Sequence, residues 1–194
     1  MKQSGGAVGY MAEIVPVFSE QDVANTVASV AGAISADFDG SDLVVICVLK
    51  GAFVFFADLV REFAFQVDID FVGFSSYGSR TEPSKSIRLT KPIESDIKEK
   101  KVLVVEDIVD TGFTAQAIKQ YLAGFGPAEI RLCTLLDKRE RRSHQVKVDY
   151  CGYVVKEGFF VGYGLDFNGL YRNLRGIYRL DRQPSEKTTH EDKE

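Results

Sequence analysis

Residues 102–114 read Val-Leu-Val-Val-Glu-Asp-Ile-Val-Asp-Thr-Gly-Phe-Thr. The four apolar residues at 102–105 predict a strand that is buried on both faces, as in a parallel sheet. Three carboxylates come next, at Glu106, Asp107 and Asp110, and the following Thr-Gly-Phe-Thr opens a predicted helix. Because open α/β sheets gather ligands at the carboxyl ends of their strands, we expect the chemistry of this protein to lie here.

The acidic cluster and the turn after it have complementary chemistry. Two hydroxyls, a flexible glycine and several backbone N–H groups at Thr111, Gly112, Phe113 and Thr114 form the arrangement that binds a phosphate at the start of a helix. Carboxylates beside such a turn suit a sugar phosphate, because they bind its hydroxyl groups directly or through Mg²⁺. The structural alternative is an ordinary helix N-terminus, where Asp and Thr are favoured caps.

Strand-like and helix-like segments alternate on both sides of this stretch. The predicted strands cover 43–49, 67–74, 130–136, 150–155 and 159–163, with a further strand-like segment at 87–89. The predicted helices cover the segment from a capping box at 19–22 to Asp37, the segment 52–64, and the segment carrying Ala115, Ile118 and Leu122. This alternation predicts an α/β fold with an open, mainly parallel twisted sheet flanked by helices.

Polar segments interrupt the alternation at three places. Residues 75–86 read SSYGSRTEPSKS and have no apolar periodicity, so we expect a long mobile loop there. Residues 137–147 are expected to form a charged loop. From Gln183 the chain has nothing to bury, which predicts a single domain over 1–182 and a disordered tail over 183–194.

Composition excludes several classes of protein. A chain of 194 residues with a net charge of −4 and a pI near 5.3 does not have the basic surface of proteins that coat nucleic acid. The first twenty residues lack the basic and then apolar pattern of a signal peptide, and we expect no membrane span. Cys47, Cys133 and Cys151 lie in apolar runs without metal-ligand spacing, which indicates reduced core thiols. A cytoplasmic location follows from these expectations.

Residues 102–114 closely resemble the phosphoribosyl pyrophosphate-binding motif of type I phosphoribosyltransferases. Within that superfamily, the remaining landmarks resemble the hypoxanthine-guanine phosphoribosyltransferase family. These landmarks are Leu49-Lys50-Gly51, Ser76-Tyr77, Asp137-Lys138-Arg139, the segment from Phe159 to Asp166, and Tyr171-Arg172. The resemblance implies a type I phosphoribosyltransferase fold with a small hood and a mobile loop. It also implies Mg²⁺-dependent transfer of a 5-phosphoribosyl group from phosphoribosyl pyrophosphate to hypoxanthine or guanine, giving IMP or GMP and pyrophosphate.

The resemblance implies a role for each part of the central motif. Glu106 and Asp107 are expected to hold the ribose hydroxyls, partly through Mg²⁺. The turn from Thr111 to Thr114 is expected to hold the 5-phosphate. Asp110 is expected to face N7 of the purine and to accept its proton. Phe113 departs from the family at a position that varies, where its backbone N–H is expected to matter more than its side chain.

Other residues take roles on the pyrophosphate side by the same resemblance. Lys50 and Gly51 are expected to present backbone N–H groups to pyrophosphate, after a Leu49–Lys50 peptide that in the family can be cis. Asp166 is the expected ligand of a second Mg²⁺ on the pyrophosphate, and Arg172 is expected to bind that pyrophosphate. Hard oxygen ligands together with substrate phosphates are the surroundings that Mg²⁺ prefers.

Residues that meet the base are also implied. Phe159 is expected to stack on the purine ring, and main-chain groups near Phe160 and Asp166 are expected to meet the base edge. Lys138 is expected to donate to the 6-oxo group. Ser76 and Tyr77 lie in the polar loop, which is expected to close over the reacting centre and keep water out.

Two alternatives remain open from the sequence. The central motif alone also fits a phosphoribosyltransferase for adenine, xanthine, uracil or orotate, although Lys138 and Phe159 favour a 6-oxopurine. A regulator that keeps this fold and binds RNA or DNA could use the basic run at 138–142, but the acidic pI and the full set of landmarks disfavour it. We expect no nucleic-acid or membrane partner and, from the family, a homodimer or homotetramer. The order of preference among hypoxanthine, guanine and xanthine stays open.

Overall fold

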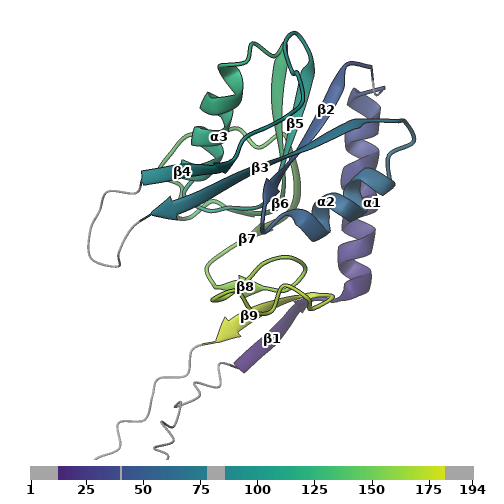
Figure 1. Cartoon of the computed structure of the whole chain (residues 1–194). Helices are drawn as coiled ribbons and strands as arrows, with labels where there is room; N and C mark the ends of the chain where they lie inside the picture. The colour runs from purple at the N-terminus through teal and green to yellow at the C-terminus, as the bar shows by residue number, and fades with distance from the viewer. Residues whose placement is uncertain (1–12, 40, 78–85, 182–194) are drawn as a thin grey trace, which may run out of the picture.

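A computed structural model of the chain describes residues 13–39, 41–77 and 86–181, which form a large sheet, three helices and a small sheet (Figure 1). The large sheet has the strand order β4-β3-β2-β5-β6-β7. Its strands are β2 (Leu43–Leu49), β3 (Asp68–Tyr77), β4 (Ser86–Lys91), β5 (Lys101–Val109), β6 (Glu129–Lys138) and β7 (Tyr150–Val155). All pair in parallel except β4, which is antiparallel to β3 at the edge. The predicted fold class is therefore confirmed.

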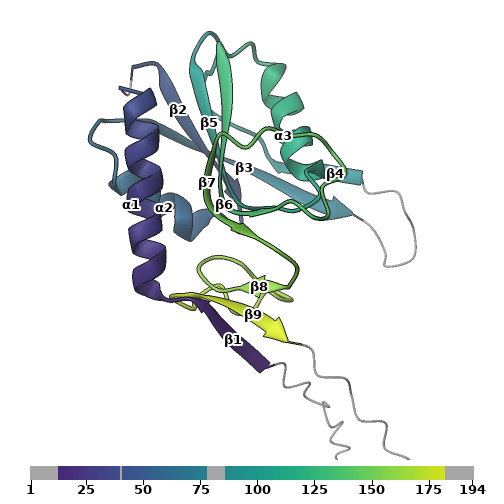
Figure 2. The ribbon, with the colours of Figure 1, turned by 180° about the vertical axis from the view of Figure 1, so that it is seen from behind.

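Helices cover both faces of the large sheet. In both views, α1 (Glu20–Asp37) and α2 (Phe53–Arg61) lie on one side of the sheet and α3 (Phe113–Ala123) lies on the other (Figures 1 and 2). Successive residues of β2 point to opposite faces, so Val45 packs in the cluster with α1 and α2, while Val44 packs in the cluster with α3. A strand between two helical layers has no polar face, which explains the unbroken apolar run of β2.

A small antiparallel sheet lies beyond the carboxyl ends of the parallel strands. It consists of β1 (Glu13–Phe18), β9 (Ile177–Asp181) and β8 (Phe160–Val161), in that order. We call β1, β8, β9 and the turns of residues 162–176 the hood. The sequence analysis assigned neither β1 nor β9, because their register joins segments from the two ends of the described chain.

Several strands are longer than predicted. β5 continues through Glu106 and Asp107 to Val109, and β6 continues through Asp137 and Lys138. The predicted strand limit at 105 and the predicted charged loop from Asp137 were wrong at these residues. Their polarity was read as the end of a strand, but hydrogen bonding to the neighbouring strands extends the ladder past the apolar run.

The loop predicted at 75–86 was also wrong at its ends. β3 runs to Tyr77 and β4 begins at Ser86, with Ser76 paired to Ile87. The remainder of that segment, 78–85, lies outside the described residues, as does the predicted tail from 183. Two other elements are shorter than expected: α2 ends at Arg61, and the strand predicted at 159–163 is reduced to β8.

The three cysteines are free thiols. Cys47 and Cys133 are buried free thiols, and Cys151 is a half-buried one. Within the described part of the chain, no helix combines the length and the apolar character needed to cross a membrane.

The capping box that was predicted at the start of α1 is present. The Ser19 backbone N–H donates to Asp22 Oδ2 at 2.9 Å, and the Asp22 N–H donates to Ser19 Oγ at 3.2 Å. These two bonds satisfy donors that the first turn of a helix would otherwise leave without partners.

Ser19→Ala should lower the free energy of unfolding by about 1 kcal/mol, because the side-chain acceptor of the cap is lost. Denaturant unfolding measures this difference. Ser29→Ala is the matched control, because Ser29 is an exposed residue within the same helix, where alanine is the better helix former. Equal effects of the two substitutions would contradict a specific contribution from the cap.

Candidate active site

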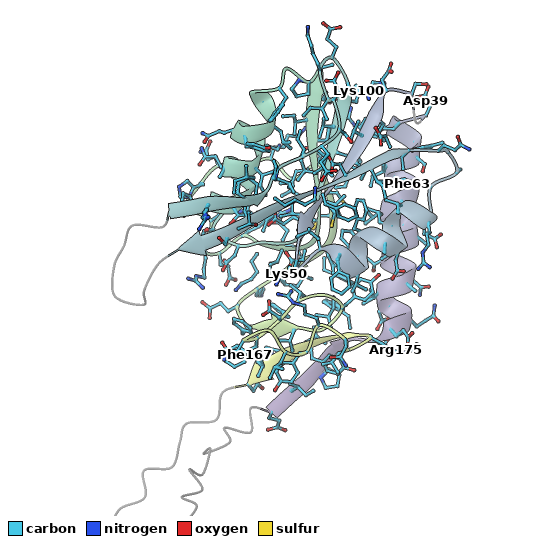
Figure 3. The ribbon with its side chains drawn as sticks, in the orientation of Figure 1. Asp39, Lys50, Phe63, Lys100, Phe167 and Arg175 are labelled. Carbon is cyan, nitrogen blue, oxygen red and sulfur yellow. The ribbon has the colours of Figure 1, made fainter. Side chains whose placement is uncertain are left out.

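Most of the polar residues that the sequence singled out gather between the large sheet and the hood. Figure 3 shows Lys50 at the end of β2, facing the hood. A hollow of about 240 Å³ opens next to it, at the end of β5 and the start of α3, and its lining is formed by residues 106–112, 114 and 115. The hollow therefore contains the predicted acidic pair, the predicted proton acceptor and most of the predicted phosphate turn.

The acidic pair near the end of β5, Glu106 and Asp107, lies where burial disfavours the charged form of a carboxyl group. Glu106 is only 6% exposed, and its Oε2 has no hydrogen-bond partner among the described residues. Burial, followed by the neighbouring Asp107 charge, raises the pKa of Glu106 well above its usual range. Burial also raises the pKa of Asp107 to about 6, although the Ile108 N–H donates to Asp107 Oδ1 at 2.9 Å and Arg172 lies near.

These two carboxylates fit a bound Mg²⁺. In the described segments, no group of three or more His, Cys, Asp or Glu side chains encloses a metal. Mg²⁺ does not need such an enclosure, since it is commonly held by one or two carboxylates together with substrate oxygens and water. The unpaired Glu106 oxygen and the raised pKa values indicate negative charge that a cation would stabilise.

The loop after β2 touches the acidic pair directly. The Leu49–Lys50 peptide is cis, and a Cβ at Gly51 would lie 1.7 Å from Asp107 Oδ2. A Cβ at Gly164 of the hood would in turn lie 2.2 Å from the Gly51 carbonyl oxygen. Only glycine fits at these two positions, so the loop of Lys50 and Gly51 is enclosed between β5 and the hood.

The phosphate turn has the backbone conformation that its sequence suggested. Gly112 is the N-cap of α3 and has a φ of 83°, a value that favours glycine. The Phe113 ring packs on His144, with ring centroids 5.2 Å apart, and it is absent from the lining of the hollow. The Phe113 N–H donates to Thr111 Oγ1 at 3.4 Å, so the expected contact of this N–H with a phosphate remains a prediction, and the first N–H groups of α3 have no partners within the helix.

Asp110 and Lys138 are brought together on the other side of the hollow. Lys138 Nζ lies 3.8 Å from Asp110 Oδ2 and donates to the Gly158 carbonyl oxygen at 3.0 Å. Arg141 Nη1 lies 3.5 Å from the same carboxylate oxygen. The other oxygen, Oδ1, is buried without a partner among the residues described. The helix-cap alternative does not hold for Asp110, because the N-cap of α3 is Gly112.

The aromatic residues before the hood strand differ in exposure. Phe159 is 43% exposed and meets Phe167 edge to face, with centroids 5.3 Å apart, so a face of its ring is available for stacking. Phe160 is buried in β8 and pairs with Arg179 of β9. Of the two, only Phe159 presents a side chain that a planar ligand could cover.

The predicted pyrophosphate residues of the hood form one ion pair. Arg172 Nη2 lies 2.6 Å from Asp166 Oδ1, and Arg172 Nη1 donates to the Gly164 carbonyl oxygen at 2.6 Å. The Gly169 N–H donates to Asp166 Oδ2 at 2.7 Å. These contacts place a guanidinium and a carboxylate beside the loop that Gly164 covers.

Ser76 and Tyr77 are the predicted site residues that are not brought to the hollow by any described contact. Both lie at the end of β3, paired with β4. Their proposed closure over the site remains a prediction.

Sequence reasoning missed the part played by Arg142. It donates to the carbonyl oxygens of Asp110 at 3.1 Å and Val109 at 3.3 Å, and its guanidinium also bonds to the Asp137 carboxylate. Asp137 is buried, and Arg139 binds it as well at 2.8 Å. Arg142 belongs to the basic run at 138–142, and its contacts hold the backbone beneath Asp110. A strand that ends in a buried acid was the available signal, since such an acid needs a cation.

Comparisons with known proteins point to one family. The phosphoribosyl transferase domain model matches residues 17–168. The hypoxanthine phosphoribosyltransferase of Haemophilus influenzae is 40% identical over 167 residues, which are 84% of this chain and 93% of that protein. The hypoxanthine-guanine phosphoribosyltransferase of Aquifex aeolicus is 39% identical over 166 residues, 85% and 93% of the two chains. A crystal structure of a hypoxanthine-guanine phosphoribosyltransferase from Bacillus anthracis has a TM-score of 0.82 and 42% identity, and the match covers 87% of this chain and 100% of that one.

Asp107→Asn should make the protein more stable at neutral pH. The pKa of Asp107 is about 6 in the folded state and near 3.8 without the fold, so the folded state binds more protons between these values and native stability falls as pH rises from about 4 to 6. An amide does not ionise and so avoids this loss of stability. The stability difference between the variant and the native protein should therefore grow from about pH 4 to 6 and stay constant at higher pH. We expect a rise of a few degrees in melting temperature, at about 2–4 °C per kcal/mol for this size of protein.

Thermal unfolding at several pH values, without divalent cations, measures the effect. Asp181→Asn is the control, because Arg179 lowers the pKa of Asp181 and the substitution should bring no gain at neutral pH. An Asp107→Asn variant that is no more stable than the native protein at pH 7 would contradict the assignment.

Proposed function

This chain belongs to the hypoxanthine-guanine phosphoribosyltransferase family, and we propose that it transfers the 5-phosphoribosyl group of phosphoribosyl pyrophosphate to hypoxanthine or guanine, giving IMP or GMP and pyrophosphate. One observation carries the proposal within the site itself. The carboxylate of Asp110, with one oxygen unpaired, lies between a phosphate-binding turn and a buried lysine that can recognise an oxo group. A sugar phosphate and a purine can therefore be held on either side of a proton acceptor.

The sugar phosphate would be held by β5 and the turn that follows it. The N–H groups at the start of α3 would bind the 5-phosphate, because they have no intrahelical partners and lie at the positive end of the helix dipole. Glu106 and Asp107 would hold Mg²⁺ and the ribose hydroxyls. When bound, that cation would neutralise the acidic pair and the negative charge of the substrate.

The proton step would belong to Asp110. As the bond from purine N9 to the sugar C1 forms and the bond from C1 to pyrophosphate breaks, the purine acquires positive charge and N7–H becomes acidic. The Asp110 carboxylate, whose Oδ1 has no hydrogen-bond partner among the described residues, would accept that proton. Lys138 Nζ and Arg141 Nη1 both lie within 4 Å of the other oxygen of this carboxylate, Oδ2.

The leaving pyrophosphate would lie toward the hood. The backbone N–H groups of the loop at Lys50 and Gly51, together with Arg172, would stabilise its developing charge. Asp166 would hold a second Mg²⁺ at the pyrophosphate, because its carboxylate lies beside Arg172, which would bind the same pyrophosphate. Ser76 and Tyr77 would close the site while the sugar carries positive charge.

We further propose that the protein acts in the cytoplasm as a homodimer or homotetramer. The support for both is what is usual in the family to which the chain belongs. Neither nucleic acid nor a membrane is a proposed partner.

Asp110→Asn should lower kcat by roughly 10²-fold or more, because the amide cannot accept the N7 proton. Steady-state rates measure kcat, and calorimetric titration with phosphoribosyl pyrophosphate measures binding, which should change much less. Asp39→Asn, at the opposite end of the sheet, is the control and should keep native rates. Unchanged turnover of the Asp110 variant, with product release shown not to limit the rate, would rule out this role.

Base choice tests the function as a whole. The native protein, assayed with phosphoribosyl pyrophosphate, Mg²⁺ and each of hypoxanthine, guanine, xanthine and adenine, should use at least one 6-oxopurine and should reject adenine by roughly 10⁴-fold. The ammonium of Lys138 has only donors, so it can pair with a 6-oxo group but not with a 6-amino group. Lys138→Ala should raise KM for the oxopurine, whereas Lys147→Ala, an exposed lysine after the same strand, should not.

Efficient use of adenine, or a native KM in the Lys138 variant, would overturn the assignment of the base site. No transfer to any of the purines, combined with salt-dependent binding of RNA, would favour the regulator that the sequence left open.

A further inference from the structure

The tip of a tight turn in the hood links the candidate site to helix α2. Residues 162–165 form this turn, in which the N–H groups of Gly162 and Leu165 donate to each other's carbonyl oxygens at 3.1 and 3.0 Å. Tyr163 and Gly164 occupy its tip with φ values of 49° and 100°. Left-handed backbone at both tip positions is the pattern of a two-residue hairpin turn, for which glycine and asparagine are the usual residues.

Tyrosine is an unusual choice at such a position, because a Cβ disfavours the left-handed conformation that glycine adopts freely. We therefore expect its side chain to make stabilising contacts that offset the cost of this backbone conformation. Tyr163 is 7% exposed, and its hydroxyl donates to Asp58 Oδ2 of α2 at 2.5 Å. Burial, and then the bond to Asp58, raises the pKa of Tyr163, so the hydroxyl stays a donor at any ordinary assay pH.

The next residue of the tip, Gly164, contacts residues of the candidate site. It covers the Gly51 carbonyl, as described above, and its N–H donates to the Arg172 carbonyl oxygen at 3.0 Å. Its own carbonyl oxygen accepts from the Arg172 guanidinium at 2.6 Å. The position of this residue therefore sets where Arg172 lies relative to the loop of Lys50 and Gly51.

Helix α2 begins directly after that loop. The Phe53 N–H donates to the Lys50 carbonyl oxygen at 3.4 Å, and Asp58 lies one to two turns further along the same helix. The bond between Tyr163 and Asp58 thus joins the two segments that would both meet pyrophosphate: the hood turn and the helix that carries the loop.

Packing and the hydrogen bond both contribute to this link. Two hollows, of about 310 and 380 Å³, both have Asp58 and Tyr163 in their linings. Tyr163 also belongs to the buried cluster that packs with α1 and α2, so the bond to Asp58 fixes the hydroxyl end of a side chain that is otherwise held by packing. Asp58 has a second partner in Arg61, so its charge stays compensated when the tyrosine hydroxyl is removed.

From this arrangement we infer that Tyr163 and Asp58 are a pair of positioning residues, which hold the hood turn on the loop of Lys50 and Gly51 and so preorganise the pyrophosphate side of the site. The inference rests on the proposed function for its kinetic meaning. The pair touches no reacting atom. It acts through the positions of Gly164, Arg172 and Gly51.

Tyr163→Phe removes the hydroxyl and keeps the ring. KM for phosphoribosyl pyrophosphate and the Kd for pyrophosphate should both rise, by roughly 3- to 10-fold, as expected when a loop loses a charged hydrogen bond that preorganises it. KM for the oxopurine, measured at saturating phosphoribosyl pyrophosphate, should stay within about twofold, because Lys138 and Phe159 are held by other contacts. Asp58→Ala should repeat this split, while Asp58→Asn, which keeps an acceptor, should lose less.

Tyr150→Phe is the matched control. Tyr150 also buries a ring and donates to an aspartate at the end of a helix, Asp37, at 2.7 Å, but it lies at the opposite end of the sheet. Both tyrosine variants should lower the melting temperature, and only Tyr163→Phe should weaken the binding of pyrophosphate. If Tyr163→Phe behaves as Tyr150→Phe does, or raises KM for both substrates alike, the pair is merely structural and the inference is wrong.

A separate readout distinguishes this failure from failure of the proposed function. Amide hydrogen exchange at residues 51–53 and 162–166 should be faster in Tyr163→Phe and in Asp58→Ala than in the native protein, whatever the enzyme catalyses. The double variant should exchange no faster than the more affected single variant, since both substitutions break the same bond. Unchanged exchange in both single variants would overturn the link. A native protein that transfers no phosphoribosyl group would refute the proposed function alone.

Discussion

The adjacent carboxylates of Glu106 and Asp107 are the constraint around which this molecule is arranged, because they place negative charge at the end of a strand that is otherwise apolar. Their pKa values are raised by burial, and a Glu106 oxygen has no hydrogen-bond partner in the described structure. Ordinary folding would avoid such a pair, since buried charge without a partner lowers stability. Keeping such a pair at the expense of stability is typical of functional sites.

Several backbone segments near the acidic pair pack against their neighbours at distances that leave no room for a side chain. Asp107 lies against Gly51, Gly51 against Gly164 of the hood, and Gly112 against the carbonyl of His144. A Cβ at any of these three glycines would clash with its neighbour, so Gly51 approaches the acidic pair, and Gly164 approaches Gly51, as bare backbone.

The cations near the site divide into two groups. Arg142 donates to backbone carbonyls and to the buried Asp137, so its role is to hold the strand ends in place. Lys138 keeps donors beyond its bond to Gly158, and Arg172 lies in the hood beside the loop of Gly51. The charged run after β6 was readable in the sequence, but burial and carbonyl partners decide which cation is structural.

The sequence by itself determined the local elements and the chemistry of the central motif. The apolar runs of β2 and β7, the capping box of α1 and the turn before α3 all follow from nearest neighbours along the chain, which is why their limits were predicted well. Only the tertiary structure decided the polar ends of β5 and β6, the pairing of β1 with β9, and the link from Tyr163 to Asp58. These features depend on partners far away in the chain, and a strand ladder or a hydrogen bond between distant segments leaves no periodic trace in the sequence of either one.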